Sequence, residues 1–180
     1  FQILCNGNLT SYPQDIVIET KNVKDFAFQL VRNSHTIKTG TFRSGNRTVP
    51  YTIVHFAPFN ENLWQDVDKS IQKAADVLTS DFAQYAYTSL TINIDEVCEN
   101  CFLSSGLFQT QDLKESNTGL DDYFLEKLSK VWVENHFDID KEKYSWLDGG
   151  LSSYYHQRWA NDNFKDSLEN QKDEFPFSNN

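Results

Sequence analysis

Three residues on neighbouring predicted strands are candidates for acid–base catalysis. His55 lies on a predicted strand, Arg43 lies on its predicted hairpin partner, and Glu19 lies on another predicted strand. Groups that titrate near neutrality, together with a cation that stabilises a pentacovalent phosphate, could cleave RNA without a metal. The alternative is that His55 fills a position on an amphipathic strand. We favour this structural interpretation, because no spacing rule links the three residues and the protein is acidic.

A second group of candidates lies in a predicted C-terminal helix. Its candidate binding residues are Tyr154, Tyr155, His156, Arg158 and Trp159. The histidine and arginine would anchor polar groups of a ligand, and the aromatic rings would stack on a sugar or a partner protein. The alternative, which we favour, is an aromatic helix that packs in the core.

The same predicted helix contains two serines, Ser152 and Ser153. A serine hydrolase of the common α/β type places its nucleophile in a Gly-x-Ser-x-Gly turn. No such turn surrounds these serines. The sequence therefore does not indicate a serine hydrolase.

The chain has three cysteines, Cys5, Cys98 and Cys101. The last two have C-x-x-C spacing, but no Trp-Cys-Gly-Pro-Cys-like context surrounds them and the only later proline is Pro176, so we expect no redox site. No second pair accompanies them, so we expect no zinc site. We expect a structural disulfide that joins Cys5 to Cys98 or Cys101. An odd number then leaves one cysteine free or bonded to a second subunit.

Phosphate-loop, dinucleotide and calcium-loop patterns are also missing from the sequence, so no cofactor or metal is predicted.

The charge balance bears on the class of partner. The 180 residues carry a formal net charge of −10, which argues against general nucleic-acid binding, because affinity for phosphates comes from clustered lysines and arginines. The densest basic group is Lys38, Arg43 and Arg47, which we interpret as a solvated turn. No apolar run is long enough to span a membrane.

Other features predict a secreted protein. Asn8 and Asn46 each begin an N-glycosylation sequon among turn-forming residues, and the chain begins at Phe1 and contains no methionine. Together with the cysteines, these features predict a processed, secreted glycoprotein.

Alternating apolar residues predict strands mainly in the first part of the chain. The predicted strands are 15–19, 25–32, 36–43, 49–56 and 87–94. Residues 44–48 are rich in turn formers and predict a hairpin between the third and fourth of these. Residues 101–118 lack a clear period, and we expect a loop there with a short helical turn.

Apolar residues at three- and four-residue steps predict helices in the second part of the chain. The predicted helices are 60–80, 120–135 and 146–168, and a loose tail is expected at 170–180. This order predicts one α+β domain over residues 1–180, with an antiparallel sheet of about four to five strands packed by about three helices.

The functional hypothesis is a secreted protein that acts by binding a protein or glycan on a cell surface. A toxin or effector subunit, disulfide-linked to a second chain, would fit this description. The alternatives are a metal-independent nuclease that uses His55 and a lectin-like module that uses the Tyr154 to Trp159 aromatics.

Overall fold

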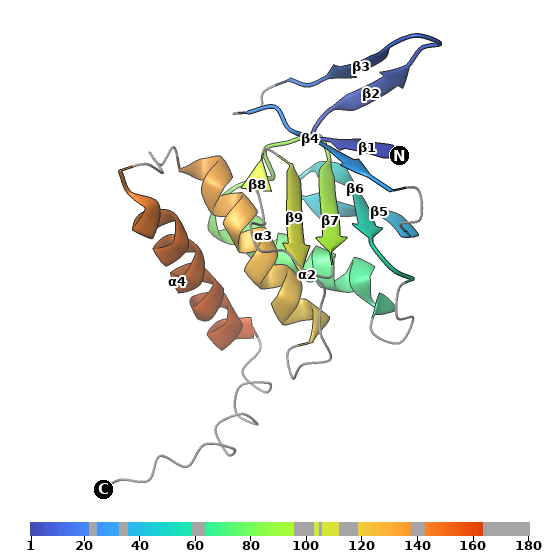
Figure 1. The fold of residues 1–180 in the computed structure, drawn as a ribbon. Helices are drawn as coiled ribbons and strands as arrows, with labels where there is room; N and C mark the ends of the chain where they lie inside the picture. The colour runs from blue at the N-terminus through green and yellow to red at the C-terminus, as the bar shows by residue number, and fades with distance from the viewer. Residues whose placement is uncertain are drawn as a thin grey trace, which may run out of the picture.

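A mixed sheet forms the centre of the computed structural model, which describes residues 1–21, 25–32, 36–58, 64–95, 103–104, 106–111, 119–137 and 143–163 (Figure 1). Within these residues the sheet has five strands, in the order β5-β6-β7-β9-β8. They span Thr36–Ser44 (β5), Arg47–His55 (β6), Leu90–Asp95 (β7), Leu103–Ser104 (β8) and Leu107–Gln111 (β9). The pairs β5–β6 and β8–β9 are antiparallel, whereas β6–β7 and β7–β9 are parallel.

The hairpin between β5 and β6 turns within residues 44–48, as the sequence predicted. Ser44 pairs with Arg47 at its end, and Gly45 lies at a φ of 62° between them. That left-handed conformation favours glycine, because a Cβ atom would approach the following carbonyl. The turn residues of the sequence therefore set the register of this hairpin.

Two of the helices cover one face of the sheet, and a third packs outside them (Figure 1). α2 (Val67–Asp81) lies in the chain between the parallel strands β6 and β7, which need such a crossover. α3 (Leu120–His136) packs beside α2, and α4 (Ser145–Asn163) packs on α3. The apolar stripe predicted for α2 is buried at Val67, Ile71, Ala74, Ala75 and Leu78.

Aromatic side chains fill much of the core between the sheet and the helices. Trp64 contacts Tyr123 and Phe124 with ring centroids 6.1 Å apart in each case. The ring of Trp132 lies 4.9 Å from that of Tyr85, and its indole N–H donates to the carbonyl of Ala83 at 3.1 Å. The high aromatic content of the sequence is thus used largely for packing across the α2–α3 side of the sheet.

The N-terminal strands form two separate two-stranded antiparallel sheets. One pairs β1 (Gln2–Cys5) with β4 (Phe28–Val31), and the other pairs β2 (Asn8–Ser11) with β3 (Ile16–Glu19). Leu4 and Val31 pack against the central sheet at Val54 and Leu107.

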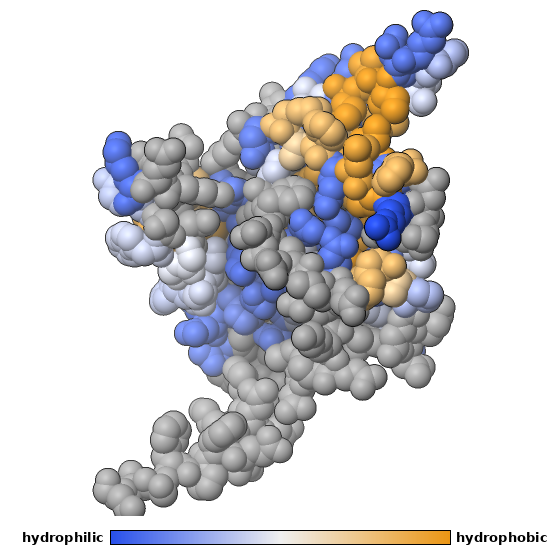
Figure 2. All heavy atoms as spheres, viewed as in Figure 1, coloured by the Kyte–Doolittle hydropathy of each residue, from blue (hydrophilic) through white to orange (hydrophobic). Residues whose placement is uncertain are grey.

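The outer surface of these two small sheets carries several exposed apolar side chains. Figure 2 shows hydrophobic side chains gathered over this end of the molecule. Exposed apolar residues here include Leu9, Ile16, Phe26, Phe28 and Leu30. Leu30 is 60% exposed, since alternate residues of β4 face away from the central sheet.

The predicted α+β class is confirmed, with strands mostly toward the N-terminus. The strand interpretation of residues 25–32 is confirmed in part, because β4 begins only at Phe28. The central sheet is mixed rather than wholly antiparallel, since the α2 crossover brings β7 alongside β6 in parallel.

The prediction of a loop at 101–118 was wrong for part of that segment. β8 and β9 lie there, and Gly106, with a φ of 85°, stands between them. Leu107 and Phe108 are both buried, so β9 lacks the alternation that marks a half-buried strand. Gln2–Cys5 and Asn8–Ser11 are further strands that the sequence pattern did not reveal.

None of the helices in the described ranges is both long and apolar enough to cross a membrane.

Candidate functional site

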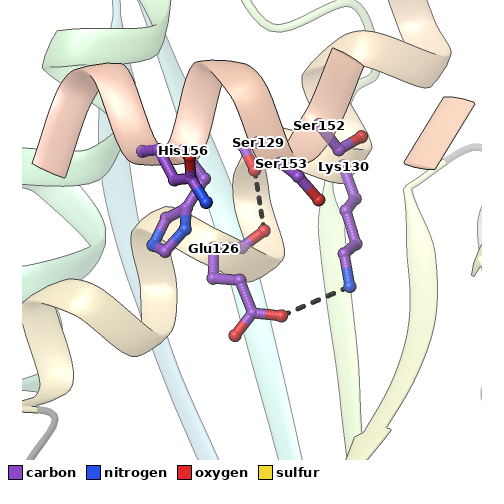
Figure 3. Close-up of a pocket in the computed structure, with 7 residues that line it drawn as sticks. Glu126, Ser129, Lys130, Ser152, Ser153 and His156 are labelled. Carbon is purple, nitrogen blue, oxygen red and sulfur yellow. Dashed lines mark hydrogen bonds and ion pairs between the residues drawn. The ribbon is translucent and has the colours of Figure 1, made fainter. Parts of the chain in front are cut away.

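A polar cavity of about 190 Å³ lies between α3 and α4, and we call it the α3–α4 cleft (Figure 3). The α3 residues that line it are Glu126, Ser129 and Lys130. The α4 residues that line it are Ser152, Ser153, His156 and Gln157. The cleft therefore combines a carboxylate, an ammonium group, an imidazole and several hydroxyl groups within a space suited to one small group of a ligand.

The charged wall of the cleft is an ion-pair cluster on α3. One carboxylate oxygen of Glu126, Oε1, lies 2.9 Å from Nζ of Lys127 and 3.2 Å from Nζ of Lys130. Burial, the largest single effect, raises the pKa of Glu126, but the hydrogen bonds and charges of the two lysines together outweigh it and hold the pKa below its ordinary value. Glu126 is therefore a carboxylate at neutral pH.

Ser152 forms the buried part of the cleft wall. The residue is 2% exposed, and its Oγ has no hydrogen-bond partner among the described residues. By contrast, Oγ of Ser129 donates to the carbonyl of Glu126 at 2.8 Å. A buried hydroxyl without a partner costs free energy, which a ligand atom at this position would recover.

His156 joins the two walls of the cleft. Its Nε2–H donates to Oδ1 of Asp122 on α3 at 3.1 Å. Of the other predicted binding residues on α4, Tyr154 is 59% exposed and Arg158 is exposed, and neither lines the cleft. The side chains of Tyr155 and Trp159 lie outside the described part of the structure. Of these three residues, only His156 therefore lines the cleft.

The structure does not bring the predicted nuclease residues together. His55 pairs with Thr36 and Arg43 with Thr48, seven positions apart on β6. At about 3.3 Å per residue this separation is roughly 23 Å. Glu19 lies on β3, in a two-stranded sheet that is not hydrogen-bonded to the central one.

The surroundings of His55 are those of a core residue. It is 2% exposed, and its ring lies 4.8 Å from Phe56 and 5.9 Å from Trp64 between centroids. The structural interpretation thus describes His55 better than a role as an accessible acid or base.

Two members of the predicted basic group bind backbone carbonyls. Nζ of Lys38 donates to the carbonyl of Trp64 at 3.0 Å. The guanidinium of Arg47 donates to the carbonyls of Tyr85 and Tyr87 at 3.0 and 3.1 Å. These contacts tie the β5–β6 hairpin to neighbouring segments, so the two side chains have structural partners.

The structure describes only part of the residues behind the secretion hypothesis. Cys5 is a free buried thiol that donates to the carbonyl of Gly7 at 3.3 Å, whereas Cys98 and Cys101 lie outside the described residues. Asn8 and Asn46 are both exposed, as a glycosylated asparagine must be. Cys5 is therefore not in the expected disulfide in this structure, whereas the second subunit and the glycans stay predictions.

Sequence reasoning found one side chain of the cleft, His156, and missed its α3 wall. Glu126 and Lys130 form an i, i+4 pair of a kind common on exposed helices, so their spacing carries no specific signal. Ser152 and Ser153 lack a nucleophile motif, so the sequence did not indicate them as site residues. The signal that helix periodicity offers is that Ser129 and Ser152 occupy positions on helix faces that are buried.

The fold resembles that of solved metallopeptidases. No protein-family model matches the chain, and a comparison with curated protein sequences gives no match. The crystal structure of an M1 zinc metallopeptidase from Deinococcus radiodurans is similar, with a TM-score of 0.65 and 14% sequence identity over 96% of this chain and 40% of that chain.

Two further solved structures show the same likeness. A two-domain M1 zinc metallopeptidase mutant bound to L-arginine has a TM-score of 0.66 and 15% identity, over 96% of this chain and 40% of that one. A mutant of the Deinococcus radiodurans enzyme bound to the substrate Tyr-Ser-Ala has a TM-score of 0.62, 14% identity and the same coverage. At this identity the likeness concerns the fold, and this chain spans about 40% of the length of those proteins.

The residues of this chain do not fit a catalytic zinc ion of the common peptidase type. Such sites often present H-E-x-x-H on a helix, and this pattern is missing from the sequence. Glu126 on α3 is preceded by the core residue Leu125 and followed three positions later by Ser129, where the pattern has histidines. No group of three histidine, cysteine, aspartate or glutamate side chains in the described ranges could hold a metal.

Proposed function

We propose that this chain acts by binding a short peptide or a single amino acid in the α3–α4 cleft, without hydrolysing it. The observation that carries the proposal is the hydroxyl of Ser152, which is buried in the cleft wall without a partner among the described residues. Such a group raises the free energy of the empty protein and becomes satisfied when a polar ligand atom enters.

The resemblance to peptidases supports the choice of ligand. The similar structures include mutants bound to Tyr-Ser-Ala, L-arginine and L-tryptophan. The volume of the cleft, about 190 Å³, suits one amino-acid unit rather than a long segment. Glu126 pairs with two lysines and not with residues that could hold a zinc ion. We therefore propose that the chain binds its ligand and does not hydrolyse it.

Isothermal titration calorimetry with Tyr-Ser-Ala tests this function. We expect saturable binding by the intact chain and by Arg158→Ala, a control on the exposed side of α4. Ser153→Trp should abolish binding, because Ser153 lines the cleft and is exposed enough to accept a larger side chain without unfolding. Chromatography should recover the tripeptide intact after incubation with and without added Zn²⁺.

Three results would overturn the proposal. Absence of saturable binding would remove the ligand class, and release of free tyrosine would remove the noncatalytic character. Binding that is lost in Arg158→Ala but kept in Ser153→Trp would move the site to the outer face of α4.

We further propose that the chain is a secreted glycoprotein whose partner lies on a cell surface. The exposure of Asn8 and Asn46 supports this setting. Expression in a secretory host should give a product whose mass falls on enzymatic removal of N-glycans. If the measured mass shows no glycan on Asn8 or on Asn46, the glycoprotein hypothesis is wrong.

A further inference from the structure

The cluster on α3 has more positive than negative charge. Lys127 and Lys130 both donate to the same oxygen, Oε1 of Glu126, so two ammonium groups share one carboxylate. The side chain of Lys130 is 49% exposed and lines the cleft, whereas that of Lys127 is 23% exposed and does not line it. If Lys130 turns toward a ligand, Glu126 keeps a cation at 2.9 Å.

The other polar groups of the cleft favour an acceptor on the ligand. The hydroxyls of Ser152 and Ser153 and the amide of Gln157 can each donate a hydrogen bond. Asp122 on α3, which does not line the cleft, accepts from His156. Figure 3 shows Lys130 extending from α3 with its ammonium group directed at the carboxylate of Glu126.

We infer that the α3–α4 cleft recognises a carboxylate of its ligand and that Lys130 is the cation that pairs with it. This inference rests on the proposed function and names the chemical group that the site selects. A carboxylate suits the site because its two oxygens can accept from an ammonium group and from serine hydroxyls together. The carboxylate can belong to the C-terminus of a peptide or to an acidic side chain.

Matched peptides separate these sources. The probes are Tyr-Ser-Ala, its C-terminal amide and Tyr-Glu-Ala amide, titrated calorimetrically into the intact chain. We expect the amide of Tyr-Ser-Ala to bind at least about tenfold more weakly than the free acid. If Tyr-Glu-Ala amide binds as tightly as Tyr-Ser-Ala, the site accepts a side-chain carboxylate; if it binds as weakly as the other amide, the site selects the terminal carboxylate.

Variants of Lys130 test the assigned residue. Lys130→Gln should bind the acid and the amide of Tyr-Ser-Ala with equal affinity, and Lys130→Arg should keep part of the preference for the acid. Lys69→Gln is the control, because Lys69 of α2 forms an exposed ion pair at 2.7 Å with Asp66, which lies just before that helix. Circular dichroism checks that each variant is folded.

The outcomes distinguish this inference from the proposed function. Equal binding of acid and amide by the unaltered chain, or an unchanged preference in Lys130→Gln, would overturn the inference and leave the proposed function standing. Failure of every peptide to bind would overturn both.

Discussion

Nε2 of His156 on α4 lies 3.1 Å from Oδ1 of Asp122 on α3, so a polar contact joins the two helices that form the cleft. The side chains of the two residues are 21% and 34% exposed, and the contact is therefore shielded from water only in part. α4 has few described residues that are buried, which makes such a contact important for its position.

Removing this contact should loosen α4. We expect Asp122→Ala to lower the free energy of unfolding by about 0.5–1 kcal/mol, a modest loss because the pair is partly exposed. Hydrogen exchange should speed up in α4 more than in α2. Asp66→Ala, which removes the exposed ion pair between Lys69 of α2 and the residue just before that helix, is the control. Unchanged exchange in α4 would show that apolar packing alone holds this helix.

Replacing the buried hydroxyl of the cleft should separate stability from binding. Ser152→Ala removes an Oγ that has no partner in the described part of the chain. The free energy of unfolding should stay within about 0.5 kcal/mol of its original value or rise, because an unsatisfied buried group is lost. Affinity for Tyr-Ser-Ala should fall.

Urea denaturation and calorimetry measure these two effects on the same variant. Ser129→Ala is the comparison variant, since it removes a hydroxyl that does have a partner, the backbone carbonyl of Glu126. A clear loss of stability in Ser152→Ala with unchanged affinity would assign its hydroxyl to the fold rather than to the site.

Asp121 on α3, which pairs with Lys73 on α2, should make the free energy of unfolding sensitive to acid. Burial, the largest effect, raises its pKa, but hydrogen bonds from Lys73 and Ser70 and the charge of Lys73 together hold the pKa below its ordinary value. A carboxyl group with a lowered pKa in the folded state stabilises the protein above its unfolded pKa. That contribution is lost as the pH falls through the folded pKa.

The variant Asp121→Asn should therefore lose stability at pH 7 and show a flatter decline below about pH 4. The difference at neutral pH should be under about 1 kcal/mol, because Asp121 is 38% exposed and solvent screens its pair with Lys73. Urea denaturation at several pH values measures it. Lys73→Met should likewise make the free energy of unfolding fall less steeply with decreasing pH. If both variants lose stability in acid as steeply as the original chain, the pair of Asp121 and Lys73 is not the cause.

His55 should behave as a core residue. We expect His55→Ala to lower the free energy of unfolding by about 2–4 kcal/mol, because it removes a ring packed against Phe56 and Trp64. Thermal denaturation measures the loss. A folded His55→Ala variant of unchanged stability that loses ribonuclease activity present in the original chain would instead restore the nuclease alternative.

Local pattern predicted much of the fold correctly. The stripe that includes Ile71 and Leu78 indicated α2, and the turn formers around Gly45 indicated the β5–β6 hairpin, because both signals act over a few neighbouring residues. Segment Leu107–Gln111 was missed, since a strand covered on both faces shows no alternation.

The candidate site could be predicted only in part. The sequence indicated that His156 lies on a helix rich in polar and aromatic groups, but Asp122 and Glu126 lie on another helix, 34 and 30 positions earlier in the chain. The sequence by itself determined the α+β class, the acidic charge and the missing H-E-x-x-H pattern, because each is a property of composition or local order. Tertiary structure decided that His55 is buried far from Arg43 and that Lys130 and Ser152 share a cleft, because strand register and the packing of α4 on α3 depend on contacts between distant residues.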